Sequence, residues 1–177
     1  MPSYIYYTWT RPDTGIVKLN CDGAVNEKGN GFGGIMRDCM GEVSVAYMGR
    51  DTTASVFQQE LNAVHRCLQL AAMEGISKIE VASDSLRVVK AINKLEAPPW
   101  QFQNQLREVW EIAESMEHFR VYHVSRETNR AADQLAGLGV NLLVHFLCFK
   151  PPVTNELCSI LEEDKNGKVY VRFNQYR

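Results

Sequence analysis

Residues 17–24 read VKLNCDGA, a run in which apolar and polar side chains alternate before an aspartate and a glycine. Alternation with a period of two is typical of a half-buried strand. Val17, Leu19 and Cys21 would share one face, and Asp22 would lie on the other face at the end of the strand. Because ligand sites in α/β proteins gather beyond the carboxyl ends of strands, Asp22 is a candidate functional residue.

Strand and helix patterns alternate along the rest of the chain. The glycine-rich stretch 29–34 is interpreted as a loop that runs into an edge strand and lets a nucleic-acid backbone approach closely. An antiparallel hairpin is predicted from residues 33–38 and 43–47. Apolar spacing then predicts strands at 79–83 and 119–124 and helices at 53–73, 86–95, 102–116 and 129–138.

Local signals mark several helix boundaries. Ser55, with Gln58 three residues later, predicts a capping box at the start of the first helix. Prolines 98 and 99 break the second helix. Gly137 or Gly139 is expected to end the last helix in a left-handed cap.

The order β-β-β-α-β-α-α-β-α indicates an α/β fold whose mixed sheet of five strands, an antiparallel hairpin plus parallel strands, is flanked by helices. We divide the chain into an irregular lead-in at 1–14, one domain at 15–139, and a C-terminal extension at 140–177 that packs on the domain or trails it. Within the extension, the turn at 164–167 predicts a small hairpin that continues into 169–173.

Composition limits the classes of function. The formal net charge is −2, which excludes a protein that holds nucleic acid by bulk positive charge alone, so local basic patches or metal ions would have to contribute. Five cysteines without a Cys-x-x-Cys pair predict free thiols in a reducing compartment. The longest apolar run, 142–149, is too short for a bilayer, and no signal sequence opens the chain. We therefore expect an intracellular protein of the cytoplasm or nucleus, without membrane association or an obligate protein partner.

Four carboxylates occupy informative positions in this pattern. Asp22 and Asp84 each end a predicted strand. Glu60 lies one position off the apolar stripe of its helix, and Asp133 lies in the first turns of the last helix, where the helix dipole favours an anion. Taken singly, such acids are usually turn, cap or solvent-facing residues, so only their joint arrangement carries weight. Together they would repel one another unless hard cations such as Mg²⁺ relieved the repulsion.

Four sequence blocks, one around each acid, resemble ribonuclease H type 1 domains in the plant-type form that accompanies non-LTR retroelement reverse transcriptases. The resemblance covers residues 16–138, and the segment after it is also similar to plant-type members. The blocks are 17–24 (VKLNCDGA), 59–63 (QELNA), 81–85 (VASDS) and 123–136 (HVSRETNRAADQLA). The resemblance implies a ribonuclease H-like fold.

The same resemblance implies an endonuclease that hydrolyses the RNA strand of RNA–DNA hybrids with two Mg²⁺ ions, for which Mn²⁺ can substitute. Asp22 would bridge both ions, Glu60 and Asp84 would hold the first, and Asp133 mainly the second. Asn129 would order the start of the last helix. The residues expected near the substrate are Gly23, Ala24, Asn26, Gln59, Ser85, Arg126 and Asn129.

The sequence departs from better-known members in two places near the site. Many members carry a histidine on a long loop ahead of the last acid, whereas the loop here, 124–129, is short. His123 falls within the predicted strand, so we expect a histidine packed against its neighbours and assign the mobile polar role near the second metal to Arg126. Val56 and Phe57 replace an Asn-Gln pair that contacts the hybrid. These departures motivate an alternative function, a catalytically weak or silent nucleic-acid-binding module of the same fold.

Overall fold

The computed structural model describes residues 2–151 and 153–174 of the 177-residue chain. Its main sheet has six strands in the order β6-β5-β2-β3-β4-β7. β2 pairs in parallel with β5, and β5 with β6, whereas β2-β3, β3-β4 and β4-β7 are antiparallel. The strands are β2 (Val17–Asn26), β3 (Gly29–Arg37), β4 (Val43–Asp51), β5 (Lys78–Ser83), β6 (His118–His123) and β7 (Phe146–Phe149).

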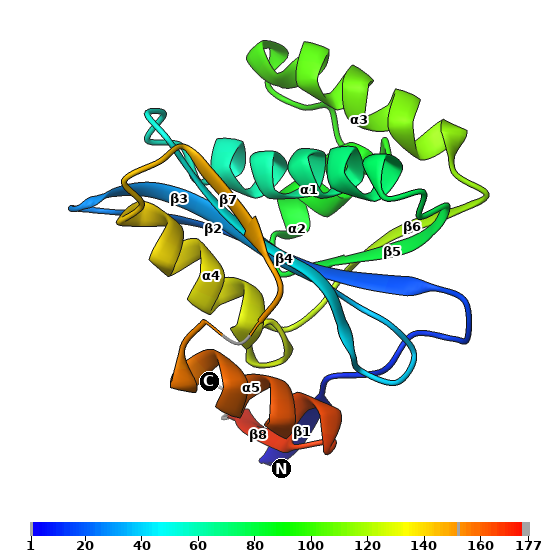
Figure 1. Ribbon diagram of the computed structural model, residues 1–177, viewed down its shortest axis with the longest axis vertical. Helices are drawn as coiled ribbons and strands as arrows, with labels where there is room; N and C mark the ends of the chain where they lie inside the picture. The colour runs from blue at the N-terminus through cyan, green and yellow to red at the C-terminus, as the bar shows by residue number, and fades with distance from the viewer. Residues whose placement is uncertain (1, 152, 175–177) are drawn as a thin grey trace.

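Helices cover both faces of this sheet (Figure 1). α1 (Val56–Met73), α2 (Leu86–Ile92) and α3 (Gln103–Ser115) lie on one face, and the short helix η1 (Trp100–Phe102) directly precedes α3. α4 (Arg130–Val140) lies on the other face and follows the short helix η2 (Arg126–Thr128). The predicted α/β class with a mixed sheet is therefore confirmed, and the sheet gains β7 as one strand more than predicted.

Each face of the sheet has its own hydrophobic core. Leu19 and Cys21 of β2 pack with α1, α2 and α3, as the alternation in the sequence predicts. Ile35 of β3 packs on the opposite face with Leu135 of α4. The predicted start of α1 is also confirmed, because the Ser55 side chain accepts a hydrogen bond from the backbone N–H of Gln58. β2 is thus held between two packed layers.

The glycine-rich stretch has a different role from the one predicted. It forms β3, an inner strand rather than a loop before an edge strand. A Cβ atom on Gly31 would lie 2.6 Å from the backbone oxygen of Ala136 in α4, so the glycine lets this helix rest directly on the sheet. The predicted cap at Gly137 or Gly139 is also wrong, since α4 runs to Val140.

Both terminal regions are more regular than predicted. The lead-in contains β1 (Ser3–Thr8), and the extension contains α5 (Asn155–Lys165) and β8 (Val169–Asn174). β8 does not form the predicted local hairpin; it pairs antiparallel with β1 in a second sheet of two strands (Figure 1). The signal for α5 was present in Thr154, whose side chain accepts a hydrogen bond from the Leu157 N–H and caps the helix.

A buried polar network connects these terminal regions to the sheet. Arg37 Nη1 of β3 lies 2.7 Å from Asp164 Oδ2 of α5, and Arg37 Nη2 donates to Asn20 Oδ1 of β2 at 2.9 Å. The indole N–H of Trp9 donates to the same Asn20 oxygen at 2.9 Å. The lead-in and the extension therefore both contact the sheet through polar groups that water does not reach. In the described part of the chain, no helix is long and apolar enough to cross a membrane.

Candidate active site

Three of the four predicted acids meet at one end of the sheet. Cys21 of β2 and Ser83 of β5 are paired across two parallel strands, so the residues that follow them, Asp22 and Asp84, lie next to each other. Glu60 reaches the same point from the second turn of α1. One carboxylate oxygen from each of the three residues lies within 4.8 Å of the others. The structure thus brings together Asp22, Glu60 and Asp84 as a carboxylate cluster.

Gly23 allows α1 to come this close. A Cβ atom at position 23 would lie 2.7 Å from the Gln59 Cβ and 2.7 Å from the Glu60 backbone nitrogen. Neither atom belongs to the flexible end of a side chain, so any larger residue would displace the helix and Glu60 with it. The Gly23 N–H also donates to Asp22 Oδ1 at 2.9 Å. This glycine therefore fixes the position of two of the acids.

The carboxylate cluster is buried and its charges repel. Asp22 and Glu60 are each only 5% exposed. Burial, followed by the neighbouring Glu60 carboxylate, raises the pKa of Asp22 well above its usual range. Burial also raises the pKa of Glu60 to about 7, and burial raises the pKa of Asp84. Burial is the main cause of these shifts and charge repulsion adds to it, so the ionised cluster is costly without a cation.

One atom of the carboxylate cluster lacks a partner. Among the described residues, Glu60 Oε2 is buried and accepts no hydrogen bond. An unpaired buried carboxylate oxygen is costly, and a divalent cation that prefers oxygen ligands would satisfy it while offsetting the repulsion. The donor set, three carboxylates without histidine or cysteine, fits such a hard cation.

Asp133 lies at the edge of this site. Its side chain is exposed in the first turn of α4, and its charge adds to the repulsion on Asp22, Glu60 and Asp84. It is close enough to act on the carboxylate cluster electrostatically, but it is not among the three carboxylates that share a common point.

Asn129 fixes the start of α4 beside Asp22. Its amide nitrogen donates to the Cys21 backbone oxygen at 3.0 Å, and its amide oxygen accepts from Asn20 Nδ2 at 3.0 Å. The residue is 1% exposed. These bonds join α4 to β2 one residue before Asp22, which is the ordering role that the resemblance implies.

Among the other predicted substrate contacts, Gln59 is buried, whereas Ala24, Asn26 and Ser85 are at least partly exposed. Gln59 is fully buried, and its amide nitrogen donates to the Thr53 backbone oxygen at 2.7 Å, so it stabilises the start of α1 from inside. Ala24 and Asn26 follow along β2, with Asn26 exposed at its end. Ser85 caps α2, where its side chain accepts from the Val88 N–H. Gln59 and Ser85 adjoin Glu60 and Asp84 in the sequence, but Gln59 offers no exposed atom to a substrate.

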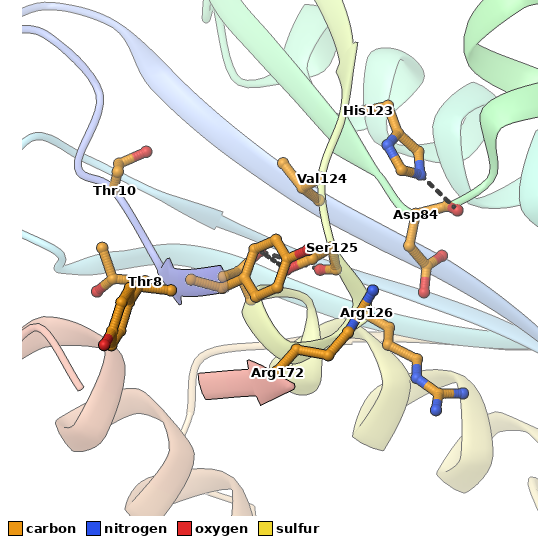
Figure 2. Close-up of a pocket in the computed structure, with 11 residues that line it drawn as sticks. Thr8, Thr10, Asp84, His123, Val124, Ser125, Arg126 and Arg172 are labelled. Atoms are coloured by element: carbon orange, nitrogen blue, oxygen red, sulfur yellow. Dashed lines mark hydrogen bonds between the residues drawn. The ribbon is translucent and has the colours of Figure 1, made fainter. Parts of the chain in front are cut away.

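His123 differs from its predicted packed position. It is exposed at the end of β6, an outer strand of the sheet, and Nε2 lies 3.2 Å from the Asp84 backbone oxygen (Figure 2). The strand ends at this residue. Its positive form would also lower the pKa of Asp84 and so oppose the effect of burial. His123 is therefore a polar group at the mouth of the site.

A large groove beside Asp84 was not foreseen from the sequence. It has a volume of about 1030 Å³ and extends from Asp84 and His123 past the 124–126 segment to β1 and β8 (Figure 2). Arg126 lines it, as does Arg172 of β8. Its walls come from segments far apart in the sequence, and no local pattern predicts that β1 and β8 pair. We call it the Asp84 groove; its lining also includes Tyr6, Tyr7, Thr8, Thr10, Val124, Ser125 and Thr128.

Known structures share this fold. Ribonuclease H1 of the halophilic archaeon Halobacterium salinarum superposes with a TM-score of 0.67 at 23% identity, over 71% of this chain and 98% of that chain. LC11 ribonuclease H1, solved in complex with an RNA/DNA hybrid, superposes with a TM-score of 0.65 at 18% identity, over 71% of this chain and 96% of that one. LC11 ribonuclease H1 was isolated from compost by a metagenomic approach. At these identities the likeness shows the fold.

Sequence comparison adds the family. A protein of Arabidopsis thaliana, whose name describes it provisionally as a ribonuclease H protein, is 30% identical over 175 residues. The match covers 93% of this chain but 27% of that relative, so the chain spans about a quarter of its length. The family model described as reverse transcriptase-like matches residues 20–139, a stretch that includes all four predicted acids. The chain therefore belongs to the reverse transcriptase-like family, which has the ribonuclease H-like fold.

Proposed function

We propose that this chain is a metal-dependent endonuclease that hydrolyses the RNA strand of RNA–DNA hybrids by a two-metal mechanism. The observation that carries this proposal is the carboxylate cluster, in which Asp22 and Glu60 are buried, Asp84 is half-buried, and Glu60 Oε2 has no hydrogen-bond partner among the described residues. The name of the Arabidopsis thaliana relative and the hybrid bound to LC11 ribonuclease H1 support the same substrate.

Mg²⁺ is the proposed ion, and Mn²⁺ is expected to substitute for it. Asp22, Glu60 and Asp84 would hold metal, and Asp133 would complete the set from the rim of the site. When bound, two such ions supply an activated water and stabilise the oxygen that leaves in phosphodiester cleavage. By the resemblance, Asp22 would be the ligand that the two ions share.

The chain's own polar groups would orient the substrate around these acids. His123 Nε2 must carry a proton to donate to the Asp84 carbonyl, which fixes the ring beside the carboxylate cluster. Arg126 is exposed in the adjoining groove and can pair with a phosphate oxygen. Gly23 and Asn129 position α1 and α4 around these acids.

The alternative is a catalytically weak or silent nucleic-acid-binding module. One observation favours it: Phe57 packs in the core, with its ring centroid 4.8 Å from that of Phe102, and Val56 is exposed. At the two positions where the resemblance implies polar contacts to the hybrid, this chain therefore has an exposed apolar side chain, Val56, and a core residue, Phe57. A binding module would respond to Mg²⁺ by a change of affinity without turnover.

The test is cleavage of a labelled RNA–DNA hybrid with Mg²⁺, with Mn²⁺ and with EDTA, beside single-stranded RNA and duplex DNA. Metal-dependent cutting of only the RNA strand is expected, and Asp22→Asn or Asp84→Asn should abolish it. Glu111→Gln, which changes an exposed carboxylate on α3, is the matched control. No cutting with either metal, or unchanged cutting by both aspartate variants, would contradict the proposal.

An intracellular location in the cytoplasm or nucleus remains part of the proposal. All five cysteines are free, which suits a reducing compartment. Cys21 and Cys67 are fully buried, and burial raises the pKa of both thiols, so neither is a ready nucleophile. Fractionation of cells that express the tagged protein would locate it.

A further inference from the structure

The small sheet of β1 and β8 forms one wall of the Asp84 groove. Side chains alternate along its strands, so Tyr7 and Arg172 turn toward the domain, while Tyr4 and Tyr6 lie on the exposed face, where Tyr6 still lines the groove. Arg172 forms a two-pronged ion pair with Glu127 of η2, and its guanidinium lies 4.9 Å from the centre of the Tyr7 ring. These contacts hold the sheet of β1 and β8 against η2, the short helix that precedes α4, and so define the position of this side of the groove.

The groove is continuous with the carboxylate cluster. Asp84 and His123 lie at one end, Thr8 and Thr10 at the other, and Arg126 extends along the side near Asp84 (Figure 2). A ligand that enters the groove therefore starts beside the proposed reaction centre. Its volume of about 1030 Å³ is at the upper end for a small-molecule pocket, which leaves room for more than one nucleotide unit.

The chemistry of the lining suits an unpaired polynucleotide. Among the described residues, Arg126 forms no salt bridge, so its charge is available for a phosphate, whereas Arg172 is held by Glu127. Tyr6 lines the groove and is 66% exposed, so its side chain is accessible to a ligand. Aromatic rings stack on bases whose faces are free, as in single strands, and not on bases enclosed in a duplex.

We propose that the Asp84 groove is an accessory subsite for the single-stranded flank of the substrate, beyond the hybrid that the carboxylate cluster acts on. Arg126 would contact the backbone of the flank, and Tyr6 would stack on one of its bases. This subsite rests on the proposed function, since it takes an extension of the same substrate. The terminal segments of this chain would then select hybrids that carry an overhang over blunt ones.

The experiment compares a short blunt hybrid with four hybrids that carry a single-stranded extension of about six nucleotides, one at each end of each strand. Binding is measured by fluorescence anisotropy in the Asp22→Asn background, so that no strand is cut. An extension at one of the four ends should lower the dissociation constant by about fivefold to tenfold, the effect of one stacked base. Equal affinity for the blunt hybrid and all four extended ones would overturn the proposal.

Substitutions at Tyr6 of β1 and at Arg126 of η2 locate the effect. Tyr6→Ala should bring the ratio of blunt to extended dissociation constants close to one, and Arg126→Ala should reduce it. Tyr4→Ala is the matched control, because Tyr4 is 60% exposed on the same face of β1 but does not line the groove. Its ratio should equal that of the parent. Equal effects of Tyr4→Ala and Tyr6→Ala, with thermal unfolding unchanged, would refute a specific subsite.

The subsite and the proposed activity can fail separately. If the parent chain cuts the blunt hybrid but shows no preference for any extension, the subsite is wrong and the activity stands. If the parent chain cuts nothing but binds one extended hybrid more tightly in a manner that needs Tyr6, the activity is wrong and the groove remains a nucleic-acid site.

Discussion

Arg37 and Asp164 form an ion pair with 2.7 Å between Nη1 and Oδ2, and their side chains are only 1% and 2% exposed. Arg37 belongs to β3 of the main sheet, and Asp164 to α5 of the C-terminal extension. Burial lowers the pKa of Arg37 and raises that of Asp164, so each charge depends on the other to remain ionised inside the protein. The extension is thus joined to the sheet by a contact that is expensive to break.

Replacing Asp164 with Ala should lower the free energy of unfolding by about 3–5 kcal/mol, since it leaves the Arg37 guanidinium buried without a counter-charge. Urea denaturation measures this loss. Glu162→Ala is the control, because that neighbour on α5 is exposed, and its effect should stay within about 0.5 kcal/mol. Similar losses for the two variants would show that α5 is not anchored by this pair.

Asp22→Asn should have opposite effects on activity and on stability. Removing one charge from a buried, repelling cluster should stabilise the metal-free protein, whereas losing a metal ligand should reduce cleavage by more than about 100-fold. Thermal unfolding in EDTA and hybrid cleavage in Mg²⁺ measure the two effects. A variant that is both inactive and less stable in EDTA would indicate that Asp22 has a structural role instead.

The metal-free protein should be less stable at pH 8 than at pH 5. Burial raises the pKa of Glu60 from 4.5 to about 7, so the folded state binds this proton more tightly than the unfolded chain does. The resulting stability is complete below pH 4.5 and is lost as the pH rises through 7. Unfolding in EDTA should show a loss from Glu60 on the order of 2 kcal/mol, and Glu60→Gln should remove that part of the loss. The part that remains comes from Asp22 and Asp84, whose pKa values are also raised. Added Mg²⁺ should restore stability at pH 8, and an unchanged melting temperature would argue against a cation site.

Two glycines of α4 should respond in opposite directions to substitution by alanine. A Cβ at Gly139 would lie 2.5 Å from the Gly49 backbone oxygen, so Gly139→Ala must push the helix off the sheet. A Cβ at Gly137 would meet nothing within 4 Å, so Gly137→Ala should stabilise the helix by about 0.5–1 kcal/mol. Chemical denaturation of both variants decides the point. Equal effects would mean that α4 does not rest on β4 at Gly139.

Local sequence patterns predicted part of the centre of the molecule. The alternation that ends at Asp22 predicted the first part of β2. The positions of four acids, together with the family resemblance, predicted one site, in which the structure brings Asp22, Glu60 and Asp84 together. Asp133 was harder to place, because a position in the first turn of a helix does not fix which way an exposed side chain extends.

Contacts between distant segments were not predictable in the same way. β1 pairs with β8 through backbone hydrogen bonds, and the sequence of neither strand indicates which strand it pairs with. The glycines of β3 led to the prediction of a loop. Their actual role is to leave space for α4 above Gly31, and the local sequence does not show this because α4 is remote in sequence. His123 was expected to be packed because a strand pattern does not show where the strand ends.

The pairing of β1 with β8 also has a consequence for the order of folding. The Thr8 hydroxyl donates a hydrogen bond to the backbone oxygen of Lys168, 160 positions further along the chain. The strands and helices that carry the carboxylate cluster lie between these two residues in the sequence. Closing so long a loop costs entropy that is recovered only after the intervening segments are compact. We therefore expect the acids to assemble early and the wall beside them to be added last, so a partly folded molecule would hold the proposed reaction centre without its overhang selectivity.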